Sequence, residues 1–175
     1  MSANGHLQRG LEELEIGATL VSRGRTITET DVVSFAALTG DWHPQHSDAE
    51  WASSSRFGER VAHGMLLISY GIGLLPLDPE RVVALRGLDG LVFKRPVSIG
   101  DTIHAEARVD GVRPVDEAVA IADLALRIKN QRGATVARAT VHAVWRRDPA
   151  PGEPNGPAPR AEPRGAEPER QEVFL

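Results

Sequence analysis

The segment HGMLLISYGIGLL, residues 63–75, is the most apolar stretch of the chain and decides what kind of fold the chain can form. It is shorter than the roughly 20 residues that a membrane-spanning helix needs, so we expect a buried helix. Gly71 and Gly73 lie inside this helix, where each glycine weakens an isolated helix by up to ~1 kcal/mol. Their presence predicts that another element packs closely against the helix backbone, as a sheet wrapped around the helix would.

Four segments after this helix alternate between apolar and polar residues as strands do, and short turn sequences join them. A strand-like segment, residues 18–28, also precedes the helix. The pattern predicts an antiparallel sheet, with an interruption of the alternation that indicates a slip near Asp123. The four later segments are residues 81–97, 101–112, 117–130 and 134–147.

Length and composition indicate one soluble globular domain. The 175 residues suit a single core, and 41% hydrophobic with 25% charged residues is an ordinary globular composition. A net charge of -4 argues against nucleic acid as a partner, and the absence of cysteine excludes disulfides and thiolate sites. The first fifteen residues lack the apolar core of a secretory signal, so we expect a cytoplasmic protein without a membrane partner.

The two ends of the chain differ from its middle. Residues 148–175 carry seven of the twelve prolines and almost no large apolar residues before the last three positions. Such a segment cannot bury enough apolar surface to offset its ordering entropy. We therefore expect a flexible N-terminus at residues 1–13, one folded domain at residues 14–147 and a disordered tail at residues 148–175.

The stretch TGDWHPQHSDAEWA, residues 39–52, gathers acidic residues, two histidines and two tryptophans ahead of the apolar helix. Pro44 prevents a regular helix from continuing through its middle. A second short helix is expected to begin at Ser47 or Asp48 and to run to about Phe57. The histidine-rich part is therefore predicted to be a loop between helices.

Asp41 and His46 are the candidate acid–base pair of this loop. The first helix ends at Gly40, and the rigid Pro44 lies between the two side chains, so a carboxylate and an imidazole can turn toward one water or one proton. The spacing also allows a purely structural arrangement, in which Asp41 caps a turn and His46 lies at a helix start.

The sequence His63-Gly64-Met65 opens the apolar helix. The first amides of a helix have no partner within the helix and carry the positive end of its dipole. A glycine lets a ligand carbonyl approach the backbone closely, which makes the N–H of Gly64 a candidate oxyanion donor. Alternatively, Gly64 only relieves crowding where the helix meets the sheet.

Together, these residues resemble the MaoC-like dehydratases, the family of (R)-specific enoyl-CoA hydratases with a hotdog fold. The family pattern is GD-x-N-P-x-H, then HGM after about sixteen residues, then an aromatic residue, a proline and a Gly-Asp turn. The resemblance covers residues 14–146. The matching positions are Gly40, Asp41, Pro44, His46, His63, Gly64, Met65, Phe93, Pro96, Gly100 and Asp101.

The resemblance implies an α+β domain in which a curved antiparallel sheet of about five strands wraps around a long central helix. It also implies a homodimer or a higher homo-oligomer. The implied activity is that of a hydro-lyase: reversible syn hydration of a trans-2-enoyl thioester, or dehydration of an (R)-3-hydroxyacyl thioester. The resemblance implies no metal or redox cofactor. Coenzyme A or phosphopantetheine is part of the substrate and is not counted as a cofactor.

By the same resemblance, Asp41 and His46 hold the catalytic water and exchange protons, and the amide of Gly64 binds the thioester oxygen. His43 stands where the family most often has asparagine, and Ile72 stands where serine is frequent. We expect His43 and Pro44 to brace the loop. The residues expected at the substrate are His63, Met65, Trp42 and Ile72.

Other functions remain open at this point. A hotdog protein can be an acyl-CoA thioesterase, or a non-catalytic acyl-binding subunit of a heteromeric dehydratase, although such a subunit is expected to lose Asp41 or His46. A metal site at Asp41, His43, His46 and His63 lacks the helical spacing of known metal motifs. The sequence leaves undetermined the acyl chain, the thiol carrier, the pathway and which of Asp41 and His46 is the base.

Overall fold

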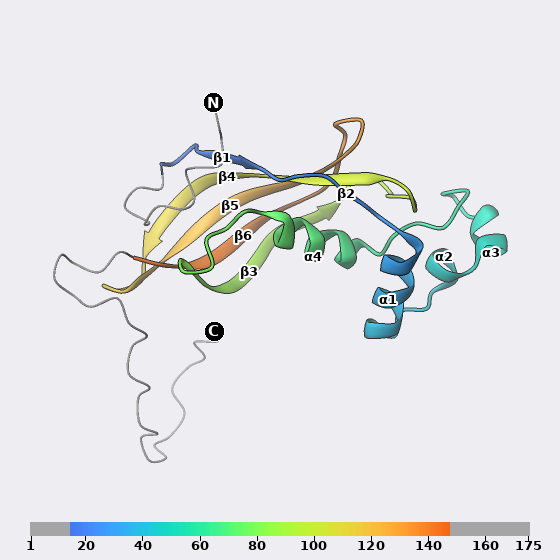
Figure 1. Cartoon of the computed structure of the whole chain (residues 1–175), viewed down its shortest axis with the longest axis horizontal. Helices are drawn as coiled ribbons and strands as arrows, with labels where there is room; N and C mark the ends of the chain where they lie inside the picture. Colours follow the sequence, from blue (N-terminus) through green and yellow to red (C-terminus); the bar gives the residue numbers. More distant parts are fainter. Residues whose placement is uncertain (1–14, 148–175) are drawn as a thin grey trace, which may run out of the picture.

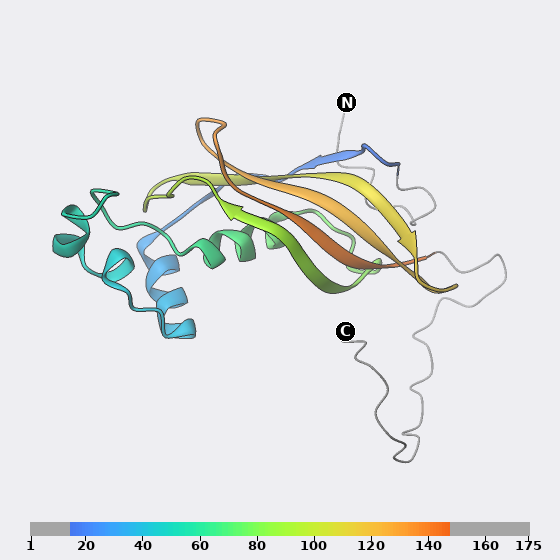
Figure 2. The same cartoon turned by 180° about the vertical axis from the view of Figure 1, so that it is seen from behind.

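A computed structural model describes residues 15–147 of the chain. A curved sheet covers helix α4 (Gly64–Leu74), while three further helices gather at one end of the molecule (Figure 1). The same arrangement is seen from behind in Figure 2. The predicted α+β hotdog arrangement is confirmed. The segments at 1–13 and 148–175 lie outside the described residues, so their predicted flexibility and the domain boundaries stay predictions.

The sheet has six strands in the order β1-β4-β5-β6-β3, with β2 also paired to β4, and all pairs are antiparallel. There are six strands and not about five, because residues 18–28 form two short strands. Between them the hydroxyl of Ser22 accepts a hydrogen bond from the N–H of Ala105. The strands are β1 (Thr19–Val21), β2 (Arg25–Thr26), β3 (Val82–Phe93), β4 (Thr102–Pro114), β5 (Val119–Asn130) and β6 (Thr135–Arg146).

Helix α1 (Glu29–Thr39) begins at a capping box. The hydroxyl of Thr28 accepts a hydrogen bond from the N–H of Asp31, whose carboxylate accepts one from the N–H of Thr28. The helix ends at Gly40, which has a φ of 79°, in the left-handed region that favours glycine. These two ends fix the direction in which the chain enters the histidine-rich stretch.

The prediction that this stretch is only a loop is wrong. Residues Pro44–Ser47 form α2, a single helical turn that contains His46, and α3 (Ala49–Ser53) follows. Pro44 occupies the first helical position, where its missing N–H is not needed, so the proline begins a helix, while the preceding helix has already ended at Gly40. α3 begins close to the predicted start, directly after Asp48, whose carboxylate caps it, but α3 ends before the predicted Phe57.

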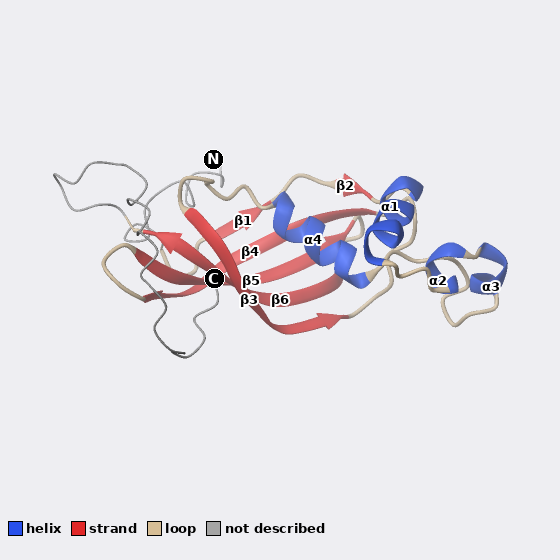
Figure 3. Cartoon of the chain, turned by 90° about the horizontal axis from the view of Figure 1, so that it is seen from below, coloured by secondary structure: helices blue, strands red, loops and turns tan. Residues whose placement is uncertain are grey.

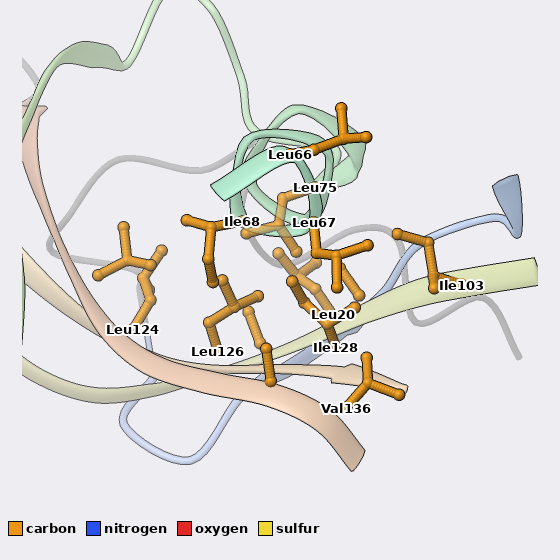
Figure 4. Packing of buried hydrophobic residues seen from close by; sticks show 14 of the residues in the cluster. Leu20, Leu66, Leu67, Ile68, Leu75, Ile103, Leu124, Leu126, Ile128 and Val136 are labelled. Atoms are coloured by element: carbon orange, nitrogen blue, oxygen red, sulfur yellow. The ribbon is translucent and has the colours of Figure 1, made fainter. Parts of the chain in front are cut away.

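The core lies between α4 and the concave face of the sheet. Leu67 and Ile68 project from α4 toward Leu126 and Ile128 of β5 (Figure 4), and all four side chains are at most 3% exposed. Full burial of one such side chain contributes about 1.5–3 kcal/mol. The helix and the sheet are therefore held together mainly by this apolar contact.

The two glycines of α4 have different surroundings. A Cβ added to Gly71 would lie 2.8 Å from Cγ1 of Ile128, which is closer than real Cβ contacts. Apart from the glycine itself, its neighbours in the chain and the backbone of α4, no described atom lies within 4 Å of a Cβ added to Gly73. The predicted close approach of the sheet is confirmed at Gly71 and wrong at Gly73.

The predicted slip in the strand around Asp123 is also wrong. β5 pairs with β6 without a shift from Val119 to Ile128, and the irregularity lies in β4, between Val109 and Gly111. The core face of β5 starts with the small residues Ala120 and Ala122 and continues with leucines, so the apolar alternation is unbroken. Ile121, which suggested the slip, lies on the opposite face.

None of the described helices is long and apolar enough to cross a membrane.

Candidate active site

Three segments meet beside the N-terminal end of α4, which points toward α1 and α2 (Figure 3). They are the turn after α1, the helical turn α2 and the first turn of α4. A cavity of about 850 Å³ lies between them and the end of β3. Its described lining includes Asp41, His43, His46, His63, Gly64, Met65 and Phe93. Most of the residues predicted for the site are therefore brought together.

Asp41 is the first residue after the cap of α1. Its N–H donates a hydrogen bond to the hydroxyl of Thr39, and its carboxylate accepts one from the N–H of His43, each at 3.3 Å. The turn is thus held by hydrogen bonds from its backbone N–H groups to its own side chains. The carboxylate of Asp41 stays exposed to the cavity.

His46 is held by one ring nitrogen. Its Nδ1–H donates to the backbone carbonyl of Val61 at 2.6 Å, since a carbonyl can only accept. Nε2 therefore carries the lone pair. Burial lowers the pKa of His46, and the neighbouring His63 and His43 lower it further, while the Val61 carbonyl and Asp41 oppose the change. The neutral imidazole is the favoured form near pH 7.

His63 lies directly under this ring and is only 2% exposed. The two imidazoles stack with centroids 3.8 Å apart and planes inclined by 27°. Nε2–H of His63 donates to the backbone carbonyl of Asp41 at 3.0 Å. One side chain thus touches both members of the predicted acid–base pair.

A carboxylate oxygen of Asp41 and one ring nitrogen each of His46 and His63 lie within 4.8 Å of one another. One water can bridge two groups at such a separation by hydrogen bonds of about 2.7–3.0 Å. A metal ion fits poorly, because imidazole lone pairs lie in the ring plane and the two nearly parallel rings do not aim theirs at one point. Zinc would need nitrogens at about 2.0–2.1 Å.

His43 occupies the cap of α2. Its Nδ1 accepts a hydrogen bond from the N–H of Gln45 at 3.1 Å, and the edge of its ring meets Trp51 at 5.4 Å between centroids. An asparagine side chain can cap a helix in the same way. Histidine at this position therefore supplies the hydrogen bond that braces the turn, and its ring centroid lies 6.3 Å from that of His46.

The N-terminus of α4 is open toward the cavity. Helices α1, α2 and α3 each have a side chain that accepts from a first-turn N–H, whereas no described side chain caps α4. A Cβ added to Gly64 would lie 2.7–2.8 Å from three ring atoms of Phe93. Glycine thus avoids a clash with Phe93, which is the alternative left open from sequence, and no side chain of residue 64 covers the amide.

The remaining predicted residues divide into two groups. Met65 lines the cavity and is 50% exposed. Trp42, at 52% exposure, and Ile72, which packs against the core, are not among the described residues that line the cavity. Sequence analysis missed the Val61 carbonyl and Arg56, because neither belongs to a motif.

Comparison with known proteins agrees with this geometry. The family model of the MaoC-like domain matches residues 13–127. The chain is 45% identical to Protein MaoC of Klebsiella aerogenes over 53% of its own length, but it spans only 28% of that protein. It is 35% identical to the (R)-specific enoyl-CoA hydratase of Aeromonas caviae, covering 70% of this chain and 89% of the hydratase.

A solved structure, the monoamine oxidase regulatory protein from Archaeoglobus fulgius, superposes with a TM-score of 0.76 at 38% identity. The match covers 81% of this chain and 96% of that one. The chain therefore belongs to the MaoC-like domain family.

Proposed function

We propose that the protein hydrates trans-2-enoyl thioesters and, in reverse, dehydrates (R)-3-hydroxyacyl thioesters. The observation that carries the proposal is the approach of the Asp41 carboxylate to His46 beside the uncapped N-terminus of α4, in a cavity of about 850 Å³. The name of the hydratase from Aeromonas caviae, which is similar over most of its length, supports the same reaction.

In hydration, one water lies between Asp41 and His46. Nε2 of His46 accepts a proton from this water as the water oxygen forms a bond to C3 of the enoyl group. The imidazolium then delivers a proton to C2 on the same face, so the proton balance closes and the addition is syn. The Asp41 carboxylate holds the water and stabilises the imidazolium. Groups of this kind contribute roughly 10²–10⁴-fold to a rate.

Negative charge develops on the thioester oxygen as C3 is attacked. The amide of Gly64, at the positive end of the α4 dipole, is the donor that we assign to this oxygen. One preorganised donor of this type is commonly worth about 2.7–4 kcal/mol. Protein groups supply both the proton transfer and the charge stabilisation, so we propose that no metal or redox cofactor takes part.

Three exposed cations, Arg56, Lys94 and Arg95, line the same cavity. Among the described lining residues Asp41 is the only carboxylate, so the mouth of the cavity favours an anionic ligand. We propose that these cations meet the phosphates of coenzyme A or the phosphate of a carrier-bound phosphopantetheine arm. Either is the thiol part of the substrate.

A homodimer is also part of the proposal. β3 is a long edge strand to which only β6 is paired among the described strands. Val83, Leu85 and Val92 on it are 39–48% exposed. A long, exposed, apolar edge strand is a template for pairing with another chain. A second copy that pairs along β3 would provide partners for the free backbone groups of this edge. Sedimentation measurements test the dimer.

The cytoplasmic location stays a prediction, which cell fractionation tests.

The test of the function is a panel of trans-2-enoyl-CoA substrates of rising length and branching, followed by loss of the enoyl absorbance. Hydration of at least one member without thiol release is expected. Release of free coenzyme A without addition to the double bond would instead identify a thioesterase. If only carrier-bound substrates react, the phosphopantetheine arm is the carrier, and inactivity on both sets would favour the non-catalytic subunit.

A further inference from the structure

His63 is a buried imidazole whose hydrogen bonding is only half satisfied. Its Nε2–H donates to the carbonyl of Asp41, while no described residue gives Nδ1 a hydrogen-bond partner. Because the carbonyl requires a proton on Nε2, Nδ1 keeps a bare lone pair in the interior. An unpaired buried polar atom costs stability, and a phenylalanine would fill the same space without that cost. Stability alone therefore does not explain a histidine here.

The contacts of the ring indicate what the histidine does. It precedes Gly64 in the chain, so it belongs to the segment that carries the oxyanion donor. Its hydrogen bond reaches back to Asp41, and its face stacks on His46 at 3.8 Å. The ring thus contacts Asp41 and His46 directly, and the backbone of the same residue is joined to the Gly64 amide.

We propose that His63 is a positioning residue, which fixes the distance between the Asp41–His46 pair and the Gly64 amide without touching the substrate. This proposal rests on the proposed function. The hydrogen bond from Nε2 ties the Asp41 turn to the start of α4, and the stacked rings set the tilt of His46. Catalysis is sensitive to such placement, since an error of about 1 Å can cost roughly 100-fold in rate.

Two substitutions separate the effect of the hydrogen bond to Asp41 from the effect of the stacking on His46. His63→Phe keeps an aromatic ring against His46 and removes the hydrogen bond to Asp41. His63→Gln keeps an N–H donor at about the position of Nε2 and removes the ring. We expect His63→Phe to lower kcat roughly 10–100-fold with little change in KM and no loss of thermal stability. His63→Gln is expected to keep more of kcat than His63→Phe.

The matched control is His104, a partly exposed histidine of β4 that lies outside the cavity lining. His104→Phe and His104→Gln are expected to leave kcat unchanged. The proposal is overturned if both His63 variants keep the wild-type kcat. It is equally overturned if kcat falls only in proportion to the folded fraction in both variants, because His63 would then be purely structural.

A second measurement does not depend on activity. The titration of the His46 ring, followed by NMR, reflects the groups that face it: His63, Asp41 and His43. Because the nearby His63 lowers the pKa of His46, both His63 variants are expected to move this titration to higher pH. An unmoved titration contradicts the proposal even if no thioester is turned over, whereas inactivity of the wild-type protein alone contradicts the proposed function.

Discussion

Two histidines on different sides of the sheet show how surroundings separate a catalytic group from a structural one. His46, in the cavity, has one nitrogen bonded to a carbonyl and the other free, and burial lowers its pKa. His142 of β6 lies on the outer face and is bonded at both nitrogens to carboxylates, at 2.6 Å to Asp123 and 3.0 Å to Asp89. The hydrogen bond to Asp123 is the main cause that raises the pKa of His142.

His142, Asp123, Asp89 and Arg113 form what we call the outer cluster, in which Asp123 also binds an arginine. Arg113 of β4 forms two hydrogen bonds of 3.0 Å with Asp123, so β3, β4, β5 and β6 are all linked through His142 and its partners. A charged histidine whose two N–H groups are both used has no lone pair for proton transfer. A shifted pKa beside a carboxylate therefore does not identify a catalytic histidine, and a free nitrogen in a cavity is the better criterion.

The largest difference between the cavity and the outer face is expected when the acid–base residues of the cavity are substituted one at a time. Asp41→Asn and His46→Ala are each expected to reduce hydration of an accepted enoyl-CoA by at least roughly 100-fold. His46→Ala removes the group that transfers the proton, and Asp41→Asn removes the charge that holds the water and stabilises the imidazolium. Initial rates on the preferred substrate check this, with circular dichroism to verify folding. His142→Gln is the matched control, and an equal loss of rate in that variant would contradict the contrast.

Gly64→Ala tests the other half of the cavity. The new Cβ meets the ring of Phe93, so that ring or the start of α4 must shift, and hydration is expected to fall by roughly 100-fold. Phe93→Ala in the same chain is expected to restore part of the rate. Phe57→Ala, a cavity aromatic that does not meet this Cβ, is the control and restores none. No recovery in either double variant would mean that the substrate itself needs the glycine.

The opposite pKa directions predict opposite pH limits. His46 must be neutral to act, and burial lowers its pKa below the ordinary 6.5, so kcat/KM is expected to fall only as the pH drops below that value. The hydrogen bonds of protonated His142 stabilise the fold below pH 6.5, and this contribution is lost as the pH rises through its raised pKa. Rate and melting temperature measured over the same pH series check both directions. An acid limb above pH 6.5 would contradict the account of His46.

The smallest effect is expected on the outer face. His142→Gln removes the two ion pairs of His142 and leaves the Arg113–Asp123 pair in place, and partly exposed pairs are worth up to about 1 kcal/mol each. A decrease of a few degrees in melting temperature is expected below pH 6.5, shrinking at higher pH, with kcat unchanged. Differential scanning calorimetry at two pH values measures it. A decrease that grows with pH would mean that neutral His142 is the stabilising form.

The elements that local patterns specify could be predicted from sequence. The apolar run gave α4, and the motif residues Asp41, His46 and Gly64 do line one cavity. The one-turn helix α2 was missed because a proline ends one helix and begins another with the same chemistry. Gly71 and Gly73 both lie inside the same apolar run, so the sequence does not distinguish them. Only the three-dimensional structure shows that Ile128 lies against Gly71 and that the sheet does not approach Gly73.

Long-range contacts were beyond the sequence for a different reason. The partner of His46 is a backbone carbonyl, that of Val61, which leaves no side-chain signature. The stack of His46 on His63 depends on how α2 packs against the start of α4. The contacts of His142 with carboxylates 19 and 53 positions away depend on strand register. Register is set by the whole sheet, so no single segment reveals these pairs.

The central claim is that one water adds across the double bond of a thioester held between the Asp41–His46 pair and the Gly64 amide. The most direct test is the reaction of trans-crotonyl-CoA, or of the panel's best substrate, in deuterated water, with the product analysed by NMR and chiral chromatography. We expect a single diastereomer with one deuterium at C2 and the R configuration at C3. Free coenzyme A with no deuterium at C2, or the S configuration at C3, would contradict it.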